Sequence, residues 1–113
     1  MPVLEWSDAA LEELAEILVW IAVHRGAELA ETVRAEAEVA ALAAAETPLR
    51  YPWVGSIFRR LAEADRSYRR VLAWGDRLHL FFRYLESKNR VVVLHVRGTR
   101  RRPLAPSRLL KKR

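Results

Sequence analysis

The 113-residue chain contains no cysteine, only four glycines and no long hydrophobic run. The absence of cysteine excludes a disulfide framework, and it also excludes thiolate chemistry at a nucleophile or a metal ligand. The longest apolar stretch, Ile17–Val23, is much shorter than the roughly 20 residues that a membrane-spanning helix needs. The N-terminus does not resemble a secretory signal. We therefore expect a cytoplasmic protein with no membrane partner.

The chain also lacks the residues that several common kinds of catalytic centre need. The four glycines are isolated, so no glycine-rich loop is available to hold a phosphate group. None of the five serines lies in the strand-to-helix turn that exposes a nucleophile. The three histidines, His24, His79 and His95, do not have the spacing of a metal-ligand motif. We expect neither a metal nor a cofactor.

The net charge of +6 is unevenly distributed along the chain. Residues 1–48 hold ten acids and two arginines, whereas residues 49–113 hold 18 bases and four acids. The last 17 residues contain eight bases and no acid. Such a basic segment predicts contact with a polyanion or with an acidic partner. The length fits one domain, which we place at residues 1–103, followed by a basic tail at 104–113.

Two helices are predicted in the acidic half. Apolar residues recur with the spacing of one helix face over Asp8–His24, where Ser7 or Asp8 can cap the first turn and Gly26 follows the last. Residues Ala27–Glu46 are rich in Ala and Glu and end before Pro48. The two helices should form a hairpin with an alanine-lined contact.

Strands are predicted on both sides of this hairpin. Residues Pro2–Trp6 are short and apolar, which is typical of an edge strand. Residues Tyr68–Trp74 and Leu78–Leu85 flank Gly75-Asp76, which favours a tight turn. A third strand, Arg90–Arg97, follows a three-residue loop in which Asn89 adopts the left-handed conformation. We therefore expect an α+β fold in which the helical hairpin covers one face of a small antiparallel sheet.

The loop lengths predict which strand residues share a face. A two-residue loop sets Trp74 opposite Arg77, and a three-residue loop sets Arg83 opposite Val93. One face is then almost wholly apolar, includes Tyr84 and should contact the helices. The other face is open and mixed, and it is the best candidate site, with Arg70, Leu72, Trp74, His79, Phe81, Arg83, Val91, Val93, His95 and Arg97.

This open face permits two interpretations. Arginines and histidines on one surface can hold RNA phosphates and stabilise the charge that develops when a 2′-hydroxyl attacks. An endoribonuclease would use His95 as acid or base, Arg83 and Arg97 as phosphate clamps, and Phe81 or Trp74 to stack a base. Alternatively, the basic residues are solvated or bind an acidic segment. The candidates for contact with RNA or with an acidic partner segment are Arg70, Trp74, His79, Phe81, Arg100 and Arg101.

The order of these motifs resembles a known family. The opening VLEWSDAALEELAEILVWIAVHRG resembles the start of the RelE/ParE superfamily of bacterial toxin–antitoxin proteins, also called plasmid stabilisation proteins. The shared features are a short strand ending in Trp, then Ser, then a helix, and they are supplied by Trp6-Ser7, Ala10, Leu14, Ile17 and Trp20-Ile21-Ala22. RRVLAW and LHLFFRY resemble the central hairpin, and VVVLHVRGTRRRP resembles the last strand and basic turn.

The resemblance implies a compact toxin of a type II module. An antitoxin with an extended, helix-containing segment would wrap it, giving a toxin–antitoxin hetero-oligomer. RelE-like members cleave messenger RNA in the ribosomal A site, whereas ParE-like members poison DNA gyrase and have no established catalytic residues. The long hairpin and the Trp6-Ser7 opening look more ParE-like. Gly98 stands where many members carry His, and no His-Tyr pair closes the chain.

We therefore expect a growth-inhibiting toxin that acts on gyrase in the ParE manner. The first alternative is a RelE-like, ribosome-dependent mRNA endoribonuclease. The second alternative is a non-catalytic RNA-binding module.

Overall fold

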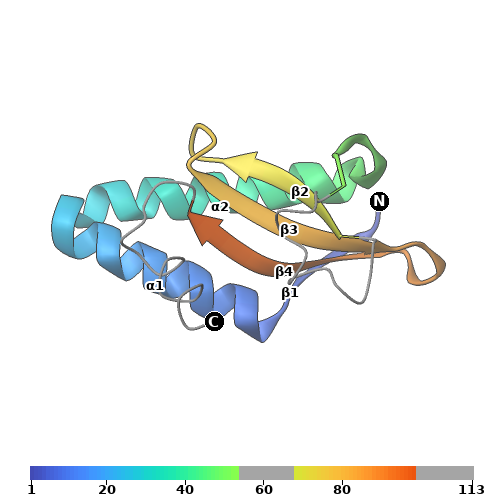
Figure 1. The fold of residues 1–113 in the computed structure, drawn as a ribbon, viewed down its shortest axis with the longest axis horizontal. Helices are drawn as coiled ribbons and strands as arrows, with labels where there is room; N and C mark the ends of the chain where they lie inside the picture. The colour runs from blue at the N-terminus through green and yellow to red at the C-terminus, as the bar shows by residue number, and fades with distance from the viewer. Residues whose placement is uncertain (54–67, 99–113) are drawn as a thin grey trace.

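The computed structural model describes residues 1–53 and 68–98, and these residues form helices and strands in the predicted order (Figure 1). The predicted Arg100, Arg101 and tail lie outside the described residues. Short 3₁₀ turns occupy Pro48–Arg50 and Glu86–Lys88. The main elements are β1 (Val3–Trp6), α1 (Asp8–Arg25), α2 (Ala27–Glu46), β2 (Tyr68–Ala73), β3 (Leu78–Leu85) and β4 (Arg90–Gly98).

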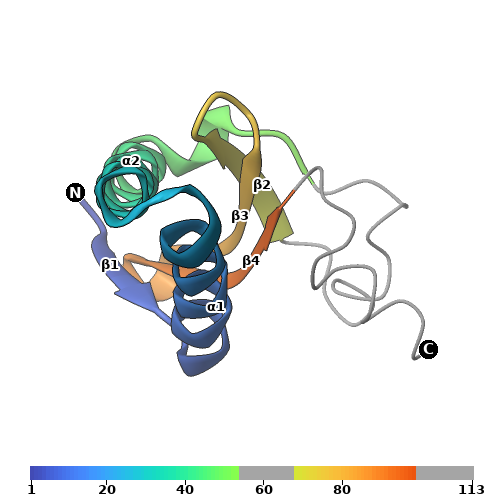
Figure 2. The same ribbon diagram turned by 90° about the vertical axis from the view of Figure 1, so that its left-hand side faces the viewer.

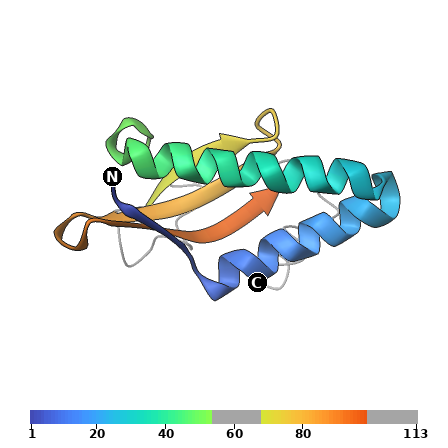
Figure 3. The ribbon, with the colours of Figure 1, turned by 180° about the vertical axis from the view of Figure 1, so that it is seen from behind.

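Both helices lie on one side of a four-stranded sheet with the strand order β1-β4-β3-β2 (Figure 2). This arrangement confirms the predicted α+β fold, with β1 at an edge. The β2-β3-β4 meander is antiparallel, as expected, but β1 pairs with β4 in the parallel direction, so the sheet is mixed. A parallel neighbour requires a crossover connection, and here the helical hairpin begins that return path across the sheet (Figure 3).

The helical hairpin forms where the sequence predicts it. The Ser7 side chain accepts a hydrogen bond from the backbone N–H of Ala10 at 3.0 Å, which caps α1. α1 extends to Arg25, one residue beyond the prediction, and α2 has the predicted bounds. Gly26 alone connects them, with φ of 112° and ψ of 148°, a conformation that is natural only to glycine.

The core lies between the helices and the sheet. Small side chains of α2 face this core, since Ala30, Val33, Ala37, Ala41, Ala44 and Ala45 are all buried. The sheet contributes larger residues, of which Phe82, Leu78 and Leu80 have no exposed surface. None of the buried side chains in the described ranges is polar or charged. The small alanine side chains therefore let α2 approach the sheet closely, and this close packing excludes water from the core.

The β2–β3 hairpin has the predicted register. Arg70 pairs with Phe81 and Leu72 pairs with His79. Gly75 and Asp76 occupy the two central positions of the turn with φ of 59° and 70°, and the N–H of Arg77 donates to the carbonyl of Trp74 at 3.0 Å. Trp74 itself has φ of 53° and belongs to the turn rather than to β2.

The β3–β4 pairing differs from the prediction near its turn. Leu85 pairs with Arg90, so the connection takes four residues, although Asn89 is left-handed as expected, with φ of 52°. The one-residue difference in register turns Val91 and Val93 into the core, where both are buried. Their predicted place on the open face was therefore wrong.

A β-bulge restores the predicted register farther along β4. The shift lies between Phe81 and Phe82, which pair with His95 and Val93, so Leu94 has no partner residue on β3. His95 therefore lies opposite Phe81, and Arg97 lies opposite His79, as predicted. Half-buried Tyr84 packs against the core cluster, which confirms its predicted face.

The β2–β3 turn provides a test of backbone strain. Gly75→Ala should lower the free energy of unfolding by about 1–2 kcal/mol, because an L-residue is disfavoured at positive φ. A Cβ atom at Gly75 would meet no heavy atom within 4 Å, so the cost is conformational and not steric. Gly98→Ala is the matched control, since its Cβ also meets open space and its φ is not in the positive range. Urea unfolding measures both variants, and equal effects would contradict this explanation.

Candidate functional site

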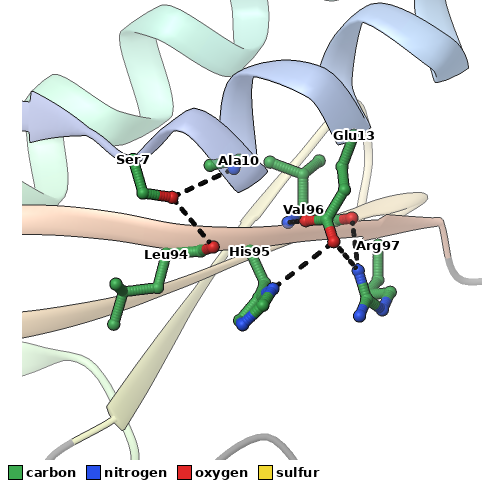
Figure 4. Close-up of polar contacts among 7 residues, drawn as sticks. All are labelled: Ser7, Ala10, Glu13, Leu94, His95, Val96 and Arg97. Carbon is green, nitrogen blue, oxygen red and sulfur yellow. Dashed lines mark hydrogen bonds and ion pairs between the residues drawn. The ribbon is translucent and has the colours of Figure 1, made fainter.

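The candidate site begins at the outer edge of β4. β1 pairs with β4 only as far as Val93, and α1 lies beside the following residues (Figure 4). The N–H of Ser7 donates to the carbonyl of Val93 at 2.9 Å, and the Ser7 hydroxyl donates to the carbonyl of Leu94 at 3.1 Å. Ser7 thus caps α1 and also continues the edge hydrogen bonds of β4.

Glu13 of α1 completes this edge. Its Oε1 accepts a hydrogen bond from the backbone N–H of Val96 at 2.8 Å. Its Oε2 accepts one from Nη1 of Arg97 at 2.7 Å and lies 3.4 Å from Nδ1 of His95. Figure 4 shows the three donors converging on this one carboxylate from β4. The contact joins residues more than 80 positions apart in the chain.

Partial burial makes the Glu13 cluster stronger than an exposed ion pair. The side chains of Glu13 and His95 are each 24% exposed, and that of Arg97 is 19% exposed. Burial acts to raise the pKa of the Glu13 carboxyl, but the hydrogen bonds from His95, Arg97 and Val96 outweigh it and hold this pKa below its ordinary value. Glu13 is therefore the ionised partner in the cluster.

The structure brings two of the three proposed catalytic residues together, but it engages both with Glu13. The guanidinium of Arg97 bonds the carboxylate and also the carbonyl of Val96 at 3.2 Å. A substrate phosphate at Arg97 would have to compete with a carboxylate already in place. Arg83, the third candidate, pairs with Tyr68 and Val92 on the neighbouring strands.

Sequence reasoning missed Glu13 among the acidic residues of α1. Glu12 and Glu16 are exposed on the outward side of α1. Glu13 lies three residues after Ala10 and four before Ile17, both of which belong to the buried face or border it. An acid within an apolar helical stripe is the signal that points to a specific partner.

The remaining candidate residues lie on the sheet face away from the helices, except that Phe81 is less exposed than expected and Trp74 lies elsewhere. Arg70, His79 and Arg83 are partly buried there, by the alternation of strand residues. Phe81 shares this face, where it lies on a central strand between Arg70 and His95, but it has no exposed surface. It is therefore not the open stacking surface that the sequence suggested.

Trp74 also differs from its predicted position. Its left-handed turn conformation removes it from the strand alternation, and its ring packs against the core cluster. The guanidinium of Arg77 lies 5.0 Å from the centre of that ring. Trp74 is thus a partly buried aromatic covered by a cation, and not a member of the open face.

His79 has an environment unlike that of His95. Its ring meets Phe81 edge-on, with 6.0 Å between centroids. Burial lowers the pKa of His79, and the nearby charge of Arg70 lowers it further, against a smaller opposing effect of Asp76. The neutral form of the His79 ring is therefore favoured beside Arg70.

Within residues 1–53 and 68–98, no three His, Asp or Glu side chains gather to form a possible metal site. In the same ranges, neither helix has the length and apolar character to span a bilayer.

The Glu13 cluster predicts a specific pH dependence of stability. Because the folded-state pKa of Glu13 is lowered, its stabilisation is present above the unfolded-state pKa and is lost as pH falls through the folded-state pKa. Glu13→Gln should cost about 1–3 kcal/mol at neutral pH and flatten the stability curve in acid. Urea unfolding between neutral pH and pH 3 measures both effects. Glu12→Gln controls for the loss of one carboxyl from α1, and an unchanged curve for Glu13→Gln would refute the assignment.

Known proteins share the sequence pattern and the fold of this chain. A family model described as ParE toxin of type II toxin-antitoxin system, parDE, matches residues 4–103. The fold is similar to a structure titled chromosomal ParDE TA system from P. aeruginosa, with a TM-score of 0.69 and 16% identity over 88% of this chain and 98% of that one. No match was found among curated proteins.

A second solved structure shares the fold more distantly. The isolated E. coli RelE toxin matches with a TM-score of 0.54 and 15% identity, over 99% of this chain and 98% of that one. At these identities the two structures establish the fold, while the family model covers most of the chain. The predicted resemblance to RelE/ParE toxins is thereby confirmed, and the chain belongs to the ParE toxin family of type II toxin–antitoxin systems.

Proposed function

We propose that this ParE-family toxin inhibits growth by acting on DNA gyrase and that a cognate antitoxin neutralises it. The observation that carries the proposal is the engagement of both His95 and Arg97 by Glu13. A nuclease needs an acid or base and an anion clamp that are free to meet the substrate. Here the carboxylate occupies both groups, which favours action by binding over RNA cleavage.

Family membership and charge support the antitoxin as partner. The matching P. aeruginosa structure is titled as a ParDE system, so a ParD-type antitoxin is the natural counterpart of this chain. The sheet face away from the helices carries Arg70 and Arg83, whereas the exposed side of α1 carries Glu12 and Glu16. An acidic antitoxin segment would be attracted to the sheet and repelled by the helix.

One observation favours the RelE-like alternative. His95 and Arg97 lie on the same strand two residues apart, and Arg83 shares their side of the sheet, which is an arrangement that suits RNA phosphates. If RNA displaced the Glu13 carboxylate from His95 and Arg97, these two side chains could act on messenger RNA in the ribosome. This alternative predicts cleavage of messages that disappears with Arg83→Ala or Arg97→Ala.

Parallel target assays distinguish the two activities. The purified chain should inhibit supercoiling by gyrase and leave in-vitro translation and its messages intact, with inhibition relieved by the antitoxin. Cleaved messages together with normal supercoiling would establish the RelE-like alternative instead. Absence of growth arrest, gyrase inhibition and message cleavage would remove the basis for the proposed toxin activity.

The antitoxin surface can be tested by charge reversal. Arg83→Glu should weaken antitoxin binding about tenfold or more, because it places like charges across the interface, and the loss should be greatest at low salt. Lys88→Glu makes the same change of charge in the exposed β3–β4 turn and should have little effect. Calorimetric titration at two salt concentrations measures both. Equal affinities of the two variants would place the antitoxin elsewhere.

A further inference from the structure

The outward side of α1 carries an unusual number of exposed apolar side chains for a helix of this size. Val19 is 62% exposed, Val23 is 72% exposed and Trp20 is 44% exposed, while Leu11, about two turns nearer the N-terminus, is half-exposed. Neither α2 nor the sheet covers them. An apolar surface of this kind on a small protein indicates a contact with another molecule.

The exposed side of α1 forms a ridge with a shallow groove beside it. Leu11, Ala15, Val19 and Val23 follow one another at four-residue intervals, which makes a ridge along the helix. Beside it lies a shallow depression of about 460 Å³, lined by Ala15, Glu16, Val19, Trp20, Val23 and His24. A ridge beside a groove on one helix is what packing against a second copy of the same helix requires.

The exposed charges along this side of α1 are also self-complementary. The carboxylates of Glu12 and Glu16 lie in the N-terminal half, and the guanidinium of Arg25, next to His24, lies at the C-terminal end. Glu16 is four residues before Trp20 and His24 is four residues after it. A two-fold axis near Trp20, with the helices antiparallel, therefore sets Glu16 of each copy opposite His24 of the other.

The aromatic end of the depression is already ordered in the single chain. The rings of Trp20 and His24 stack with 4.3 Å between centroids and 20° between planes. Nδ1 of His24 donates a hydrogen bond to the carbonyl of Trp20 at 2.9 Å. Little side-chain freedom remains to be lost on association, which favours binding at this end.

We propose that two copies of this chain associate through the outward side of α1, antiparallel, around a two-fold axis near Trp20. A second copy fits better than an acidic antitoxin segment, because such a segment would meet Glu12 and Glu16 on this surface. The antitoxin and the second copy thus use different layers of the fold. The proposal does not depend on the cellular target of the toxin.

Sedimentation equilibrium of the full chain tests the association without any target. The wild type should show a monomer–dimer equilibrium, and Val19→Asp should raise the dissociation constant at least about tenfold, since it buries an unpaired carboxylate. Val39→Asp is the matched control, because Val39 on α2 is 65% exposed and lies outside the ridge. It should leave the dissociation constant unchanged.

A charge exchange tests the antiparallel arrangement itself. Glu16→Lys and His24→Glu should each weaken the dimer, because each sets like charges near one another, and the double variant should recover most of the lost affinity, because the introduced ammonium and carboxylate face each other. A wild type that is monomeric at every concentration, a Val39→Asp variant as weak as Val19→Asp, or a double variant without recovery would overturn the proposal. Loss of antitoxin binding by a monomeric Val19→Asp chain would also overturn it and assign this surface to the antitoxin.

Discussion

The carboxylate of Glu13 is the contact on which the arrangement of this fold depends most. β1 is only four residues long, and among residues 1–53 and 68–98 no other strand continues its pairing along the outer edge of β4 after Val93. Ser7 and Glu13 supply the missing hydrogen-bonding groups from the start of α1. The same carboxylate neutralises Arg97, so one acidic residue closes an exposed sheet edge and compensates a partly buried cation.

This contact changes the interpretation of the basic sheet. His95, Arg83 and Arg97 share a side of the sheet and could be taken as nuclease machinery on residue type alone. With Arg97 and His95 held by Glu13, their first role is to fix β4 against α1. Under the proposed function, Arg70 and Arg83 attract the acidic antitoxin segment, and the acidic outer side of α1 repels it.

Local signals predicted much of this fold. The periodicity of Ala27–Glu46, the Ser7 cap and the Gly75-Asp76 turn each act over a few residues, and the structure confirms all three. The bulge at Leu94 could not be predicted, because an extra strand residue leaves no mark in the alternation until both strands are paired. The parallel pairing of β1 and the Glu13 cluster join distant parts of the chain, and no local pattern specifies such contacts.

The most direct test of the central claim is the growth arrest caused by a His95→Ala chain that has been shown to fold and to bind its antitoxin. His95 contacts Glu13 and so helps to attach β4 to α1, and we propose no chemical step for it. Growth arrest as strong as that of the wild type is therefore expected, with gyrase inhibited to the same extent. Loss of growth arrest in a folded, antitoxin-binding His95→Ala chain would contradict the account and make His95 a participant in catalysis.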